Sequence, residues 1–158
     1  MEKLIKVRSA SDCTVVINAP EIPLVKTWTK RGATYPIDRD KLIQAYYSTS
    51  LESLMRKGVL IIDDKDFLVE VGFIDSVEEV GPVIELTEKL MKRCIGPMPI
   101  SELKSTLECL SEYQISELAE YAILHFTELN MDRIDLLSAV SHKNILKAIE
   151  LHKAAQED

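Results

Sequence analysis

The chain has 158 residues, of which 46% are hydrophobic and 28% are charged, and its formal net charge is −7. This length suits one compact domain or two very small ones, and the apolar content is sufficient for a buried core. The negative charge argues against a general affinity for nucleic acid or for anionic membranes. No apolar run approaches the roughly 20 residues that span a bilayer, and the first residues have no signal-peptide core, so we expect no membrane association.

Three strands are predicted near the start of the chain. Residues 3–9 (KLIKVRS) alternate as a half-buried strand does, residues 13–19 (CTVVINA) form a β-branched run, and residues 24–30 (LVKTWTK) can form a third strand. Pro20 and Pro23 lack the amide hydrogen that a sheet needs, so the second run should end in a turn or at a sheet edge.

A pair of short helices is predicted next. Asp38 lies where an N-cap belongs before residues 39–47, and Ser50 can cap a second helix over residues 51–57. Gly58 follows as the residue that ends this second helix.

Residues 59–73 (VLIIDDKDFLVEVGF) are interpreted as a β-hairpin with an acidic turn at residues 63–66. A helix pair followed by a hairpin has the order of the end of a winged-helix unit. The acidic segment after it, residues 75–83, contains a Gly-Pro pair and is the candidate boundary between a mixed unit (residues 1–80) and a second unit (residues 81–158).

The second half has helical periodicity throughout. Predicted caps precede each apolar stripe: Thr87 (with Gly96 as the stop), the capping box Ser111 to Gln114, Asn130 and Ser141. The stripes include Leu103, Leu107 and Leu110, then Ile115, Leu118, Ala119, Ala122, Ile123 and Phe126, then Met131, Ile134, Leu137 and Val140, and finally Ile145, Ala148 and Ile149. The sequence therefore predicts an α+β fold: an N-terminal small mixed β unit with a short helix pair and hairpin, and a C-terminal helical bundle, which can also pack as one domain.

The candidate interaction surface is the stretch TWTKRGATYPIDRDKL, Thr27 to Leu42. Basic side chains interleaved with aromatic rings can bind single-stranded nucleic acid through phosphate contacts and base stacking. Asp38 and Asp40 lie within the stretch and can pair with its cations, which favours a structural turn or a protein interface instead. The residues concerned are Trp28, Lys30, Arg31, Tyr35, Arg39 and Lys41.

A second candidate surface is the helix that begins near Ser111. Tyr113 and Tyr121 flank acidic side chains on a helix that is apolar over a wide arc. Such a helix is either a core helix of the bundle or a surface that docks on a partner.

No catalytic, cofactor or metal site is predicted. The histidines, His125, His142 and His152, lack metal-binding spacing, and no nucleotide-binding or nucleophile-elbow motif is present. The aspartates near residue 64 fail the EF-hand pattern, which needs a glycine and a glutamate at fixed positions. The odd number of cysteines, without a C-x-x-C pair, predicts free buried thiols in a reducing compartment.

Residues 27–64 carry a tryptophan, a basic-glycine turn, a short helix pair and the strand pattern G-V-L-x-I-D. This segment resembles segments of small, uncharacterised accessory or virion proteins of tailed bacteriophages. The resemblance implies a phage accessory or structural component, located in the host cytoplasm or the virion, and identifies no functional residue.

We therefore expect a non-enzymatic structural, assembly or protein-interaction component that acts in a multimer or on a larger scaffold, with a phage particle as one setting. A protein partner or self-association is expected. The alternatives are a winged-helix-like regulator that binds nucleic acid and an acidic inhibitor of a basic partner protein.

Overall fold

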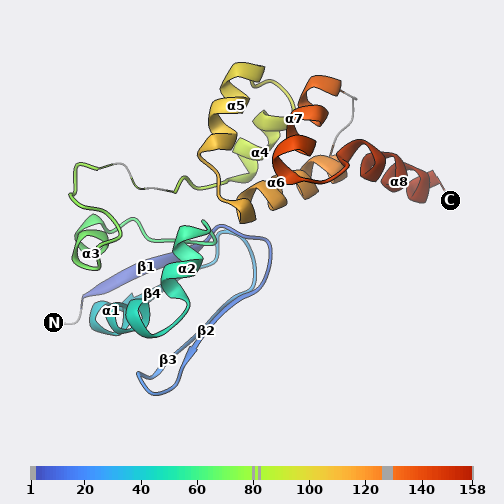
Figure 1. The fold of residues 1–158 in the computed structure, drawn as a ribbon. Coiled ribbons are helices and arrows are strands. Elements are labelled where there is room, and N and C mark those ends of the chain that lie inside the picture. The colour runs from blue at the N-terminus through green and yellow to red at the C-terminus, as the bar shows by residue number, and fades with distance from the viewer. Residues whose placement is uncertain (1–2, 80, 82, 126–129, 158) are drawn as a thin grey trace. The chain divides into compact units, whose positions relative to one another are not determined.

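A computed structural model describes residues 3–79, 81, 83–125 and 130–157. The chain divides into two compact units, Met1–Glu85 and Leu86–Asp158, which we call the N-terminal unit and the C-terminal unit. The predicted α+β class is confirmed: strands and short helices make up the N-terminal unit, and helices make up the C-terminal unit (Figure 1). No helix in the described ranges is long and apolar enough to cross a membrane.

A three-stranded antiparallel sheet forms the centre of the N-terminal unit. Strand β1 (Leu4–Ser9) pairs on one side with β4 (Thr34–Asp38) and on the other with the two-residue strand β5 (Leu60–Ile61). The predicted alternation of β1 is confirmed, because Ile5 and Val7 are buried while their neighbours face outward.

Strand β4 was not predicted from the sequence. It contains Pro36, which lies opposite Lys6 of β1. Because β4 is an edge strand, a proline there does not interrupt pairing with a further strand.

The other two predicted strands form a separate hairpin. Strands β2 (Val15–Ala19) and β3 (Leu24–Trp28) pair antiparallel as a two-stranded sheet. One face of this hairpin is buried, and Val16 and Val25 lie on the other face with 51% and 57% of their surfaces exposed.

The predicted helix pair is present as α1 (Arg39–Ser48) and α2 (Leu51–Arg56). Asp38 caps α1 by accepting a hydrogen bond from the amide of its third residue at 3.2 Å. Ser50 occupies the N-cap position of α2 but makes no side-chain cap bond, and Thr49 Oγ1 accepts the first amide of the helix instead, at 3.1 Å.

The predicted hairpin over residues 59–73 is wrong. Strand β5 is followed directly by helix α3 (Lys65–Glu70), and Asp64 is the N-cap of this helix, accepting the amide of Phe67 at 3.0 Å. The aspartates therefore begin a helix instead of forming a turn, since Asp is a strong N-cap residue. No wing of the winged-helix kind is formed by these residues.

The described part of the C-terminal unit consists of helices α4 (Glu88–Ile95), α5 (Ile100–Glu108), α6 (Glu112–His125), α7 (Met131–Ser141) and α8 (Ile145–Glu157). Helix α6 packs against α4, α7 and α8, and α5 packs against α7 (Figure 1). The core of this unit includes Leu103, Leu107, Leu118, Ala119, Ala122, Ile134, Leu137, Ile145 and Ile149. The centres of the predicted stripes are thus confirmed. Four predicted members are only half-buried, namely Ile115, Ile123, Val140 and Ala148, whereas Met131 is 46% exposed and Phe126 lies outside the described residues.

Most of the predicted caps in this unit are confirmed. Thr87 accepts the amide of Leu90 at 3.1 Å. In the capping box, the Ser111 amide donates to the Gln114 side chain at 3.0 Å, and the Gln114 amide donates to the Ser111 hydroxyl at 3.2 Å. Asn130 caps α7 by accepting the amide of its third residue at 3.1 Å.

The predicted cap at Ser141 is wrong. Ser141 is the last residue of α7, and Asn144 caps α8 by accepting the amide of Lys147 at 3.1 Å. Between them, His142 ends α7 in the left-handed conformation with φ of 58°. The reversal between the two helices is therefore made by residues 142–144.

A buried arginine ties α7 to the end of α4. Arg133 is 6% exposed, and its guanidinium donates to the carbonyl oxygen of Cys94 at 2.8 Å and to that of Met98. These are carbonyls at and after the C-terminus of α4, where four backbone acceptors lack partners within the helix. The cation also complements the negative end of the helix dipole.

Candidate functional site

The only tryptophan is a core residue and not part of a surface. Trp28 is 0% exposed, its Nε1 donates to the carbonyl oxygen of Val7 at 3.0 Å, and its ring meets Tyr35 edge-on with centroids 5.7 Å apart. Trp28 therefore anchors the β2–β3 hairpin to β1 and has no face free to stack on a base.

The arginines of the predicted basic surface pair with acidic residues from other parts of the N-terminal unit. Arg31 binds Asp12 at 3.1 Å, and Arg39 binds Glu70 on α3. Lys30 is exposed and Lys41 half-buried, and neither forms an ion pair within the residues that the structure describes. A phosphate backbone would have to displace the carboxylates from both arginines.

Tyr113 and Tyr121, the other predicted interaction residues, are half-buried on α6 in the C-terminal unit. The ring of Tyr121 lies against that of His125 with centroids 4.2 Å apart, and burial raises the pKa of the Tyr121 hydroxyl. The predicted residues are therefore divided between the two units.

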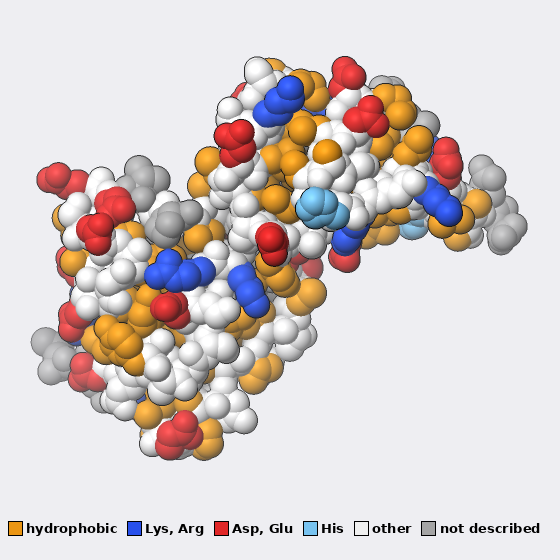
Figure 2. Space-filling model, viewed as in Figure 1, with side chains coloured by type: hydrophobic (Ala, Val, Ile, Leu, Met, Phe, Trp, Pro, Cys, Tyr) orange, Lys and Arg blue, Asp and Glu red, His pale blue; other side chains and the backbone are white. Residues whose placement is uncertain are grey.

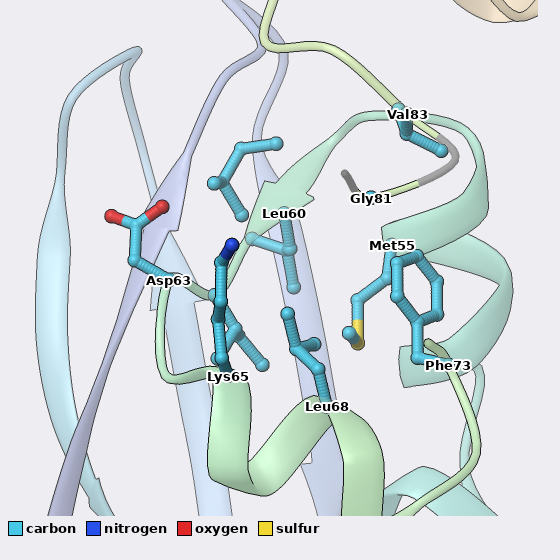
Figure 3. Close-up of a pocket in the computed structure, with 10 residues that line it drawn as sticks. Met55, Leu60, Asp63, Lys65, Leu68, Phe73, Gly81 and Val83 are labelled. Carbon is cyan, nitrogen blue, oxygen red and sulfur yellow. The ribbon is translucent and has the colours of Figure 1, made fainter. Parts of the chain in front are cut away.

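The candidate site that the structure adds is an apolar cavity in the N-terminal unit (Figure 3). Its volume is about 170 Å³. Three segments supply its walls: α2, the β5–α3 region and the segment that follows α3. Figure 3 shows Met55 and Phe73 on one side and Leu60 and Leu68 on the other, with Val83 above Met55 and Phe73.

The local sequence explains why these side chains meet. Gly58 adopts φ of 77° and ends α2, so the chain turns back into β5 directly after the helix that carries Met55. Asp64 then begins α3, which places Leu68 beside Leu60. In the predicted hairpin, Leu68 would instead have belonged to a strand paired beside β5, and this wall of the cavity would not be helical.

Charged residues surround the mouth of the cavity. Asp63 and Lys65 line it, and the carboxylate of Asp63 points away from the interior in Figure 3. Arg8 on β1 donates to Asp63 Oδ2 at 3.0 Å and to both oxygens of Glu85 at 2.6 and 3.2 Å. The hydrogen bonds that Arg8 donates to Glu85 are the largest cause that raises the pKa of the Arg8 guanidinium above its ordinary value.

The ion pairs of Arg8 fix the end of the segment that lines the cavity. Glu85 lies two residues after Val83, so its bidentate contact with β1 holds this part of the chain against the sheet. On the opposite wall, the guanidinium of Arg56 lies over the ring of Phe73, 5.0 Å from its centroid. Both contacts leave the apolar interior open.

This arrangement suits the binding of an apolar group and offers little for catalysis. Most of the side chains that line the cavity are aliphatic or aromatic, and the titratable ones are Asp63 and Lys65. Over the described ranges, no group of three or more His, Cys, Asp or Glu side chains could hold a metal ion. All cysteines are free, but the prediction that they are buried holds for Cys94 alone, since Cys13 and Cys109 are exposed.

Sequence reasoning missed the cavity because no single motif encodes it. The available signal was the spacing of Phe67, Leu68 and Val71, which is helical and places Asp64 at the N-cap. Comparison with known proteins adds no residue to the site: no family model, curated protein or solved structure matches the chain.

Proposed function

We propose that the protein is a non-enzymatic interaction component that receives an apolar side chain of a partner protein in the cavity of the N-terminal unit. The observation that carries this proposal is an open cavity lined mostly by apolar side chains, with Asp63 and Lys65 at its mouth. Buried anchor residues that enter such pockets supply most of the energy of many protein interfaces, while a polar rim orients the partner.

The size of the cavity supports a single side chain as its occupant. A cavity of roughly 150 Å³ lined by Leu, Ile and Phe is sufficient to bind benzene, and the present one has about 170 Å³. A leucine, methionine or phenylalanine side chain fits this scale. Lys65 at the mouth would favour an acidic residue beside the anchor, because Asp63 is already engaged by Arg8.

The resemblance of residues 27–64 to tailed-phage proteins supports an assembly role on a larger scaffold, with a phage particle as the setting. The ion pairs of Arg31 and Arg39 and the burial of Trp28 weigh against nucleic-acid binding. The net charge of −7 supports the alternative of an acidic inhibitor, whose binding would weaken steeply with added salt.

The test is site-specific photocrosslinking in the cell that produces the protein. A benzophenone amino acid replaces Lys65 at the cavity mouth, and in a matched variant it replaces Lys6, which is exposed on β1. We expect a discrete protein adduct from position 65 alone, and its loss when Val83→Phe fills the cavity. Equal adducts from both positions, or an adduct unchanged by Val83→Phe, would contradict the proposal.

A further inference from the structure

The C-terminal unit has an apolar groove on its surface between α5 and α7. Leu107, Leu136 and Val140 line it, its volume is about 300 Å³, and Lys104 and Glu108 stand along the α5 side. In Figure 2, apolar side chains are open to solvent on the upper part of this unit, over α5 and α7, with charged side chains around them. The groove has the form of a site for an amphipathic helix.

The two charges beside the groove are available to a binding partner. Lys104 and Glu108 are exposed and lie one helical turn apart. Within the part of the chain that the structure describes, they form no ion pair with each other or with any other group. A helix that enters the groove can therefore satisfy both, if it presents an acid and a base at the same spacing.

The end of α8 is a helix with these properties. Its buried residues, Ile145 and Ile149, face the bundle, whereas Leu151 is 62% exposed on the opposite side. The residues after Ile149 continue as helix, and Figure 1 shows the end of α8 extending beyond the other helices of this unit. Lys147 and Glu150 are exposed beside Leu151, and neither forms an ion pair within the described residues.

The charge order on α8 matches the groove in one orientation. At 100° per residue, Lys147 and Glu150 both lie on the same flank of Leu151. If α8 runs antiparallel to α5, Glu150 meets Lys104 and Lys147 meets Glu108, while Leu151 enters the groove. The spacings along the two helices, about 4.5 and 6 Å, differ by less than the reach of these long side chains.

We propose that two copies of this chain associate through their C-terminal units, with the end of α8 of one copy in the α5–α7 groove of the other. If the contact is reciprocal, it closes as a symmetric dimer and exposes no further groove. The inference concerns a different surface from the cavity of the N-terminal unit, and it supplies the self-association that a multimeric assembly component needs. Because the two surfaces are separate, either proposal can fail without the other.

The first experiment measures the mass of the full chain by sedimentation velocity over a concentration series. Leu151→Glu places a charge in the groove, and we expect the dissociation constant to rise by about tenfold or more. The matched control is Leu124→Glu, because Leu124 is 57% exposed on α6 and belongs to neither surface. A monomeric wild type at every concentration, or equal effects of both substitutions, would overturn the proposal.

The second experiment tests the charge pairing. One variant carries Lys104→Glu with Glu108→Lys, and the other carries Lys147→Glu with Glu150→Lys. Each alone should associate weakly, because every contact in its dimer joins like charges. A mixture of the two should form a heterodimer, since each groove then meets a complementary helix end. If the variants are folded and mixing them restores no association, the proposed pairing is wrong. Photocrosslinking from position 65 in the same variants tests the cavity of the N-terminal unit independently.

Discussion

Replacement of Arg133 by methionine should destabilise the C-terminal unit more than any comparable change of a surface arginine. The guanidinium is 6% exposed and bonds two carbonyl oxygens, those of Cys94 and Met98. A hydrogen bond with a charged group contributes about 1.5–3 kcal/mol, and a cation at a helix C-terminus adds up to about 2 kcal/mol in a partly buried site. Methionine recovers part of this loss by filling the space without the cost of burying a charge.

The net expectation is a loss of about 3 kcal/mol in the unfolding free energy of the C-terminal unit. Because the chain has two units, a single melting curve does not isolate this value. Urea unfolding that is monitored through the NMR amide resonances of α4 and α7 isolates it. Arg133→Lys should lose about half as much, because one ammonium cannot reproduce the planar two-donor geometry.

The matched control is Arg93→Met, which changes an arginine on α4 itself. Arg93 pairs with Glu102 at 3.1 Å, but both side chains are nearly half exposed, so the pair should contribute less than about 1 kcal/mol. If Arg133→Met and Arg93→Met have equal effects, or if Arg133→Met costs less than about 0.5 kcal/mol, then the two carbonyl bonds do not hold α4 to α7, and the reasoning is refuted.

Three further predictions concern single side chains. Asp64 accepts the amide of Phe67, and this hydrogen bond lowers the pKa of the Asp64 carboxyl. The stabilisation by Asp64 is therefore complete above the unfolded-state pKa of about 3.9 and is lost as the pH falls below that value. Asp64→Asn keeps the cap, so it should flatten the acid limb of stability in a pH series of thermal unfolding. His142→Gly should raise the unfolding free energy by about 0.5–1 kcal/mol, because glycine adopts the observed φ of 58° without steric cost; a decrease would contradict this account. Arg8→Met should increase hydrogen exchange of the amides near Val83 by the equivalent of about 1–2 kcal/mol, while exchange in α1 stays unchanged.

The features that sequence reasoning predicted correctly are local ones. The caps at Asp38, Thr87 and Asn130 and the capping box at Ser111 each depend on residues within one helical turn, so they can be identified without knowing the fold. Strand β4 was missed because Pro36 argues against a strand, and only its edge position in the sheet makes the proline acceptable.

The error over residues 59–73 also hid the candidate site. A short apolar run followed by charges fits a hairpin equally well as a strand that leads into a helix. Periodicity over so few residues does not distinguish the two structures. Because Asp64 begins α3, Leu68 lines the cavity opposite Met55 from a helix, and not from a strand paired with β5. The site is therefore a consequence of one N-cap, and an error at that residue removes the whole cavity from a sequence-based description.

The basic stretch shows how chain distance limits such reasoning. Within Thr27 to Leu42, the nearest acids in sequence are Asp38 and Asp40, but Arg31 pairs with Asp12 and Arg39 with Glu70. Charge density counted along the chain therefore overstates the free positive charge on the surface. Lys104 and Glu108 along the α5–α7 groove, and Lys147 and Glu150 on α8, have no ion-pair partner among the described residues. They are not conspicuous in the sequence, because they are ordinary i,i+3 and i,i+4 patterns on helices. The basic stretch, which is conspicuous in the sequence, therefore has few free charges, whereas the inconspicuous charges of α5 and α8 are available to a partner. For this reason the mixed charge-swap experiment addresses the C-terminal unit and not the basic stretch.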